Sequence, residues 1–246
     1  MKKFIVICAL IGLGSSKVLN FIEPLLCKSS DPEYEKCVQN GFKNATSYLL
    51  KGIPELSVPP MDPFLIPMMV VNRTHNNAVR INAISRNIRI EGARNIIVER
   101  LKADPKKNIG EIRLTLPWAY IEMEYDVTGQ LLTIPLQSKG YFKGNFSDIK
   151  FRVKTSFETY EKDADEYFRI RKISSKIVVS DGWIKLTAKN PDLQFAADII
   201  SNFFNENPQR VLEAVNPIFV ETFNELFKVV ADQILANMKA SEWLPA

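Results

Sequence analysis

The segment from Asn207 to Met238 constrains the fold more than any other part of the chain. On a helix with about 3.6 residues per turn, its apolar side chains fill an arc of about 200°, whereas an ordinary surface helix carries a stripe of roughly 100°. These side chains are Val211, Leu212, Val215, Ile218, Phe219, Val220, Phe223, Leu226, Phe227, Val229, Val230, Ile234 and Met238. The opposite, polar strip consists of Glu213, Glu221, Asn224, Glu225, Lys228, Asp232 and Lys239. The segment is therefore too polar to cross a membrane, and other parts of the chain must cover its apolar arc.

The region before this segment is predicted to supply the cover, because from about Pro67 its apolar residues recur with a period of two. Three runs carry the pattern: Val79, Ile81 and Ala83; Ile112, Leu114, Leu116 and Trp118; and Ile149, Phe151, Val153 and Phe157. Such alternation is typical of half-buried antiparallel strands. We therefore predict an α+β fold in which a highly curved antiparallel β-sheet wraps the long C-terminal helix, an arrangement that can leave an apolar tunnel.

The alternation changes phase after Pro117 and again between Phe146 and Ile149. Since a shift of one residue moves a strand's apolar side chains to the other face, each change predicts a bulge, bend or turn. Turn-forming residues at 126–129 and 180–182 predict two reversals of the chain.

Two further helices are predicted, from Asp31 to Lys51 and from Pro191 to Asn205. Asn207-Pro208 should separate the second from the final helix, which Pro217 should kink or divide. Residues 53–63 contain four prolines and are predicted to form an extended connector whose apolar side chains dock on the core.

The N-terminus has the pattern of a secretory signal peptide over residues 1–16: two lysines, a short apolar run and a small-residue exit. A buried first strand is the alternative interpretation. Residues 17–246 are then one secreted, extracellular domain. Loss of Lys2 and Lys3 lowers the formal net charge from +4 to +2, a balance that does not predict nucleic-acid binding.

Secretion implies an oxidising compartment and access to N-glycosylation, so it bears on the cysteines and on the Asn-x-Ser/Thr sequons. Cys8 lies in the predicted signal peptide, so Cys27 and Cys37 are expected to form a disulfide, with two unpaired thiols as the alternative. Asn-x-Ser/Thr sequons occur at Asn44, Asn72 and Asn145. Asn44 falls on a predicted helix, and Asn145 is the best candidate for a turn.

No catalytic constellation is present in the sequence. The single histidine, His75, lies in a polar run without a ligand partner or nucleophile beside it. Glu122, Glu124 and Asp126 share a strand face, where solvated alternation explains them better than an acid and base pair. The basic residues of 150–154 and 169–172 also alternate as a solvated face does, with anionic headgroups or acidic ligands as a weaker option. We predict neither enzyme activity nor a metal or cofactor.

Several segments together resemble the insect takeout and haemolymph juvenile-hormone-binding family. They are Cys27 and Cys37; Gly52-Ile53-Pro54-Glu55-Leu56 running into Pro59-Pro60-Met61-Asp62-Pro63; Leu114-Thr115-Leu116-Pro117-Trp118; Tyr125-Asp126-Val127-Thr128-Gly129; Leu132-Thr133-Ile134-Pro135-Leu136; and Lys139-Gly140-Tyr141-Phe142. Ser138 departs from the family, which usually has the first glycine of a Gly-x-Gly pair there. The resemblance implies the tubular lipid-binding fold of bactericidal/permeability-increasing protein, a hydrophobic ligand in the tunnel and an N-terminal disulfide.

We expect the ligand to be a small lipophilic molecule, such as a juvenile-hormone-like terpenoid, an odorant or a fatty acid. The candidate lining residues are Trp118, Met123 and Tyr125 from the sheet, Phe219, Phe223, Phe227 and Val230 from the long helix, and Phe42 and Leu49 closing one end. Solid core packing is the alternative for each of them. Tyr125 or Trp118 could orient an ester or epoxide.

The chain is thus predicted to be a secreted carrier in haemolymph or chemosensory fluid. One alternative is a secreted signalling or interaction protein that acts on feeding, mating or circadian behaviour, through a protein receptor that the sequence does not identify. Lipid transfer between bilayers is a third, which the mild charge disfavours. We expect no nucleic-acid partner and no stable membrane insertion.

Overall fold

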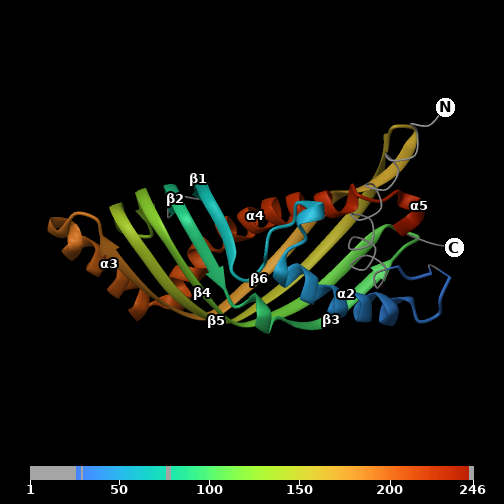
Figure 1. Cartoon of the computed structure of the whole chain (residues 1–246). Helices are drawn as coiled ribbons and strands as arrows, with labels where there is room; N and C mark the ends of the chain where they lie inside the picture. The colour runs from blue at the N-terminus through green and yellow to red at the C-terminus, as the bar shows by residue number, and fades with distance from the viewer. Residues whose placement is uncertain (1–25, 29, 76–78, 244–246) are drawn as a thin grey trace, which may run out of the picture.

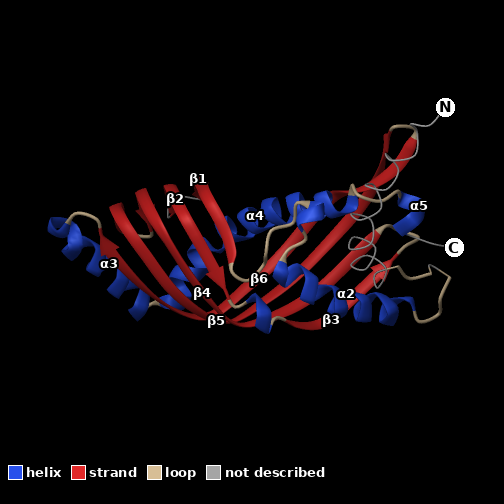
Figure 2. Cartoon of the chain, viewed as in Figure 1, coloured by secondary structure: helices blue, strands red, loops and turns tan. Residues whose placement is uncertain are grey.

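Six antiparallel strands form one curled sheet in the computed structural model, which describes residues 26–28, 30–75 and 79–243 (Figure 1). The strands are β1 (Phe64–His75), β2 (Val79–Glu91), β3 (Ile97–Asp104), β4 (Ile109–Leu131), β5 (Ile134–Lys162) and β6 (Asp165–Ala188). Their order is β1-β2-β4-β5-β6, and β3 pairs with β4. The sheet curls into a half-barrel along which the C-terminal helices run, so the predicted fold class is confirmed (Figure 2). The predicted signal peptide, residues 1–16, lies outside the described residues.

Both predicted changes of phase are confirmed, and they align across neighbouring strands. Trp118 of β4 pairs with Ser147 of β5, and Ser147 pairs with Asp181 of β6; all three residues are exposed. Buried residues lie on both sides of this row, including Leu116 and Ala119 on β4. The apolar faces of β4, β5 and β6 therefore switch at one line across the sheet, where Asp148 has a left-handed φ of 46°. We call this line the crease.

The two predicted reversals are wrong, because residues 126–129 lie inside β4 and residues 180–182 lie inside β6. Cross-strand pairing overrides the local turn preference of these residues. Gly129 has a φ of 138° and packs so closely on β2 that a Cβ would clash with the carbonyl of Arg80. The chain instead reverses at residues 132–133 and 163–164, where Leu132, Asp163 and Ala164 take positive φ values.

The three predicted helices are present in the expected places, and a short fourth helix follows them. They are α2 (Tyr34–Lys51), α3 (Gln194–Glu206), α4 (Pro208–Leu235) and the short α5 (Ala240–Trp243), with 3-10 turns at Pro54–Leu56, Ala93–Asn95 and Pro191–Leu193. The break at Asn207 is confirmed, whereas α4 continues past Pro217 and no second segment begins there. Part of the connector, Pro54–Leu56, forms a 3-10 turn instead of an extended chain, but its side chains Ile53, Leu56 and Val58 are buried as expected.

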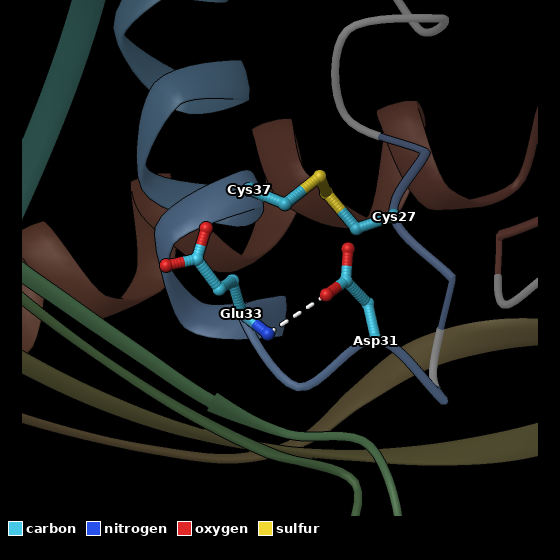
Figure 3. Close-up of a disulfide and its surroundings, with 4 residues drawn as sticks. All are labelled: Cys27, Asp31, Glu33 and Cys37. Atoms are coloured by element: carbon cyan, nitrogen blue, oxygen red, sulfur yellow. Dashed lines mark hydrogen bonds between the residues drawn. A yellow bond between two sulfur atoms is a disulfide. The ribbon is translucent and has the colours of Figure 1, made fainter.

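A disulfide between Cys27 and Cys37 ties the N-terminal segment to the first turn of α2, as predicted (Figure 3). The two Cα atoms are 6.0 Å apart. Just before the helix, the carboxylate of Asp31 accepts a hydrogen bond of 2.7 Å from the backbone N–H of Glu33, which stabilises the turn that leads into α2.

Side chains of α3 and α4 bind the free backbone edge of β6. Gln194 accepts from the N–H of Ala188 (2.8 Å) and donates to the carbonyl of Leu186 (3.2 Å). The N–H of Leu186 donates to Ser201 (3.0 Å). Asn205 binds both backbone groups of Ile184, at 2.8 and 2.9 Å. Farther along, Asp232 accepts from the N–H of Ile170 (2.7 Å) and Lys228 donates to its carbonyl. We call these contacts the β6 edge contacts.

The polar strip of α4 therefore faces the sheet edges as well as solvent. Besides the pair Lys228 and Asp232, which bind Ile170, Glu221 and Glu225 accept from Arg73 of β1 at 3.0 and 2.8 Å. Since β1 and β6 are the outer strands of the sheet, α4 lies between the two edges of the half-barrel and is bonded to both.

Removing one edge contact should destabilise the protein. Asn205→Ala leaves the N–H and C=O of Ile184 without their side-chain partners, so we expect a loss of about 2–4 kcal/mol in the free energy of unfolding. Asn202→Ala is the matched control, because Asn202 is exposed on the same helix, and its change should stay within about 0.5 kcal/mol. Urea unfolding measures both; equal values would contradict a role for the edge contacts.

Candidate ligand-binding interior

The apolar side chains that the helices and the sheet enclose fall into three clusters. The α3 cluster contains Tyr125, Leu186, Ala188 and Ala197. The central cluster contains Leu116, Ala119, Phe146, Ile149, Ile177, Ile184, Phe204, Val211 and Leu212. The α2 cluster contains Ala45, Ile53, Leu56 and Val58, with Leu49, Val230, Ile234, Met238 and Trp243 packed against it. Because α3 lies at one end of the molecule and α2 toward the other, the clusters follow its long axis (Figure 1).

Three phenylalanines of the interior form a partly covered ladder. The rings of Phe151 and Phe223 lie 5.4 Å apart, and those of Phe223 and Phe227 lie 5.7 Å apart. Phe151 and Phe223 pack against the central cluster, yet all three side chains remain only half-buried. A solid core normally covers large aromatic side chains completely. We call this set the aromatic ladder.

The same incomplete burial extends along α4. Of its residues only Val211, Leu212 and Ile218 are buried, although the apolar arc of the helix is wide. Phe219 and Val229 are 45% and 58% exposed. The half-barrel thus covers part of the helix and leaves much apolar surface within reach of solvent or a ligand.

The residues predicted to line the ligand site do not all lie together in the structure. Phe223 and Phe227 belong to the aromatic ladder, whereas Leu49 and Val230 pack against the α2 cluster. Phe42 is half-buried on α2, and Met123 is half-buried on β4.

Trp118 and Phe219 lie neither in the aromatic ladder nor against the α2 cluster. Trp118 is 41% exposed on the crease, and Phe219 is 45% exposed on α4. The periodicity misled the prediction for Trp118, because the phase changes at the residue before it.

Tyr125 is buried and its hydroxyl is already engaged. It lies 2.8 Å from the hydroxyl of Ser138 on β5, and both residues are buried. Burial raises the pKa of the Tyr125 hydroxyl, and the hydrogen bond with Ser138 opposes part of the rise. Ser138 thus supplies the hydrogen-bond partner that a buried tyrosine needs.

Phe151 and Ser138 were missed as residues of the interior. The alternation of Phe151 with Ile149 and Val153 predicts that its side chain faces the core. This pattern does not distinguish full from partial burial. Nothing in the sequence pairs Ser138 with Tyr125, since the contact depends on the register between β4 and β5.

A charged cluster covers the outer face where β4 and β5 pair. Glu111 accepts hydrogen bonds from Arg152 (2.8 Å) and Arg113 (3.1 Å), with Lys154 at 3.8 Å. The hydrogen bond from Arg152 is the main cause that lowers the pKa of Glu111 to about 2, against the opposing effect of burial. The basic residues of 150–154 are exposed, as predicted for a strand face.

The other acidic residues that the sequence singled out have ordinary surface partners. Glu122 accepts from Tyr120 (2.9 Å), Glu124 accepts from Asn87 (2.9 Å), and Asp126 forms an ion pair with Lys139 (2.7 Å). Within the described ranges, no three His, Cys, Asp or Glu side chains are grouped as metal ligands. In the same part of the chain, no helix has both the length and the apolarity of a membrane span.

The three sequon asparagines are exposed. Asn44 lies on α2, as predicted, and Asn72 lies on β1. Asn145 lies within β5 and not at a turn, which corrects the prediction for that site.

Comparison with known proteins supports a common origin for this architecture. Residues 4–245 match the family described as haemolymph juvenile hormone binding protein. The chain is 22% identical over 219 residues to the circadian clock-controlled protein daywake of Drosophila yakuba, covering 86% of this chain and 84% of that protein. Daywake of Drosophila melanogaster is 23% identical over 224 residues, with coverages of 88% and 85%.

The fold is also that of a solved structure. The crystal structure of Takeout 1 from Epiphyas postvittana matches with a TM-score of 0.70 at 20% identity, covering 90% of this chain and 99% of that chain. The likeness therefore extends over most of the chain and shows that the fold is shared.

The pair Tyr125 and Ser138 can be tested by a double-mutant cycle. Tyr125→Phe and Ser138→Ala should each cost about 1–2 kcal/mol in the free energy of unfolding, because each leaves a buried hydroxyl alone or removes one. The double variant should cost less than the sum of the two. Tyr141→Phe removes an exposed hydroxyl and serves as control. Strict additivity in thermal or urea unfolding would show that the two hydroxyls do not interact.

Glu111 predicts a specific loss of stability in acid. Its pKa is lower in the folded chain, about 2, than the ordinary 4.5, so its contribution is complete above about pH 4.5 and disappears as the pH falls toward 2. Glu111→Gln should therefore be less stable than the original chain at pH 6 and lose less stability between pH 4.5 and 2.5. Arg152→Met should reduce the same pH dependence. Identical pH profiles of the unfolding free energy would contradict this assignment.

Proposed function

This chain belongs to the haemolymph juvenile hormone binding protein family, and from this premise we propose that it is a secreted carrier of one small lipophilic ligand. Proteins of this family bind hydrophobic ligands, and the carrier role in general follows from membership. We propose that a juvenile-hormone-like terpenoid, an odorant or a fatty acid occupies the interior next to the aromatic ladder.

The single observation that supports this site is the partial burial of the aromatic ladder. Phe223 and Phe227 lie on the same side of α4 as Val220 and Val230, which pack inward. Both side chains are apolar and only half-buried, and the ring of Phe223 contacts that of Phe151 on β5. An apolar ligand would remove this surface from water, which is the principal source of affinity in sites of this kind.

The energetics agree with a small ligand. Each methylene that is buried contributes about 0.8 kcal/mol, so a chain of about twelve carbons contributes about 10 kcal/mol. Association costs several kcal/mol, which leaves an affinity between micromolar and nanomolar.

The proposed lining is narrower than the set of residues predicted from the sequence. We assign Phe223, Phe227 and Met123 to the wall, with Phe42, Leu49 and Val230 at the α2 end. Trp118 and Phe219 remain outside because of their exposure. Tyr125 serves the fold through Ser138 and is not assigned as the group that orients the ligand.

A second candidate is a secreted signalling protein that acts on behaviour. The observation that favours it is the description of both daywake relatives as circadian clock-controlled proteins. In that case the interior would serve only the fold. Binding of a lipophilic probe with one-to-one stoichiometry supports the carrier, and absence of uptake supports the signalling role.

Secretion is part of the proposal and rests on the N-terminal pattern of residues 1–16. Haemolymph or chemosensory fluid would be the compartment. Two further observations agree with an oxidising exterior: the disulfide of Cys27 with Cys37 and three exposed sequon asparagines.

Displacement of a fluorescent fatty-acid probe tests the site. Terpenoids or fatty acids should displace the probe from the original chain, and Phe223→Ala should weaken probe binding about tenfold, equivalent to about 1.4 kcal/mol. Phe195→Ala is the control, because Phe195 is 76% exposed on α3 and should leave affinity unchanged. Folding of both variants is checked by thermal melting.

Equal probe affinity of folded Phe223→Ala and Phe195→Ala would remove the aromatic ladder from the site. Failure of the original chain to bind any lipophilic probe, after organic extraction of co-purified lipid, would remove the carrier function itself.

A further inference from the structure

Large aromatic side chains are exposed on the outer face of the sheet. Trp118, Tyr141 and Trp183 are 41%, 46% and 50% exposed, although each carries a large apolar ring. Trp183 on β6 is the most exposed of the three.

Asn145 on β5 lies beside Trp183. In the sheet register it pairs with Trp183 of β6 on one side and with Tyr120 of β4 on the other. Residues that are directly opposite in an antiparallel pair project to the same face, with Cβ atoms about 4.5–5.5 Å apart. The exposed side chains of Asn145 and Trp183 are therefore neighbours on the outer surface.

The three residues of the sequon are oriented as a modification site requires. Asn145 and Ser147 are exposed, whereas Phe146 between them is buried and packs edge-on against Phe204 at 6.4 Å. The alternation of the strand thus presents the asparagine amide outward and anchors the site in the central cluster through its middle residue.

We propose that Asn145 carries an N-linked glycan whose first N-acetylglucosamine packs on the indole of Trp183. The apolar C–H face of a pyranose ring is complementary to an aromatic face, and its acetamido group contributes a further methyl. The inference rests on the secretion that is part of the proposed function, because the modification occurs in the secretory pathway.

The chemistry requires one co-reactant, a lipid-linked oligosaccharide diphosphate. The amide nitrogen of Asn145 forms a bond to C1 of the first sugar and loses a proton. The bond between C1 and the diphosphate oxygen breaks, and the lipid diphosphate leaves with the electron pair. No oxidant or reductant takes part.

The other two sequons lack such surroundings. Asn72 lies on the outer strand β1 and pairs with Asn82, with no strand on its other side. Asn44 lies on α2, where the hydroxyl of its sequon residue Thr46 donates to the carbonyl of Phe42 at 2.9 Å. Asn145 is therefore distinguished by its cross-strand contact with an exposed tryptophan.

The test uses the full chain expressed in a eukaryotic secretory host, with residues 1–16 replaced by a host signal peptide. Peptide mapping should find Asn145 occupied. After enzymatic trimming to the first N-acetylglucosamine, the protein should melt about 2–4 °C above Asn145→Gln. Trp183→Ala should abolish this difference while Asn145 stays occupied. Asn72→Gln is the matched control and should not change the melting temperature.

A second readout needs no variant. Removal of the glycan from the folded protein should increase acrylamide quenching of tryptophan fluorescence, because Trp183 becomes accessible. An unoccupied Asn145 in secreted, folded protein would overturn the proposal, as would an occupied Asn145 with unchanged quenching and a melting difference that persists in Trp183→Ala. Since the host signal peptide replaces the native one, failure of the native N-terminus to direct secretion would count against the proposed function alone.

Discussion

The side chains that bind the free backbone edge of β6 determine where the helices lie, and the rest of the structure depends on them. A strand at the end of a sheet has unpaired N–H and C=O groups that must find partners if they are covered. Ser201 and Asn205 are four residues apart on α3, a rise of about 6 Å, which matches the spacing of about 6.6 Å between alternate strand residues. They bind Leu186 and Ile184, two residues apart on β6. The residue spacing on α3 thus matches that on β6. Side chains of the helices bind the backbone groups at this edge, where no further strand pairs within the described residues.

The polar and the apolar side chains of α4 therefore contact different parts of the structure. Its polar strip is bonded to the edges of the half-barrel, through Lys228 and Asp232 at β6 and through Glu221 and Glu225 at Arg73 of β1. Part of its apolar arc packs on the central and α2 clusters, while Phe219 and Val229 stay exposed. Their exposure follows from this geometry, because a single curled sheet cannot contact both sides of a long helix.

The sequence predicted those features that depend on local pattern. Three patterns were enough to predict the fold class: the apolar arc of α4, the alternation of the strands, and the phase changes near Pro117 and Phe146. Each depends on the burial of one face of a single helix or strand. The paired cysteines were equally informative, since Cys27 and Cys37 are close along the chain.

Features that depend on contacts between distant residues could not be predicted. The partners of the polar strip of α4 could not be predicted, because no pattern links Lys228 to the backbone of Ile170, 58 residues earlier in the chain. Gly129 and Gly182 are typical turn residues in local sequence, but cross-strand packing retains both within strands. Partial burial of the aromatic ladder was equally hidden, because hydrophobicity indicates which face is inward and not how much space remains there.

The crease has a consequence for how the length of this chain can vary. Because β4, β5 and β6 exchange their inner and outer faces at the same line, a single residue gained or lost within one strand would place its inward side chains outward on one side of that line. The neighbouring strands would then have to change length at the same level. Insertions and deletions are therefore compatible with the fold mainly at the hairpin tips. Between the crease and a given level of the sheet, the number of residues can change only if it changes in all three strands.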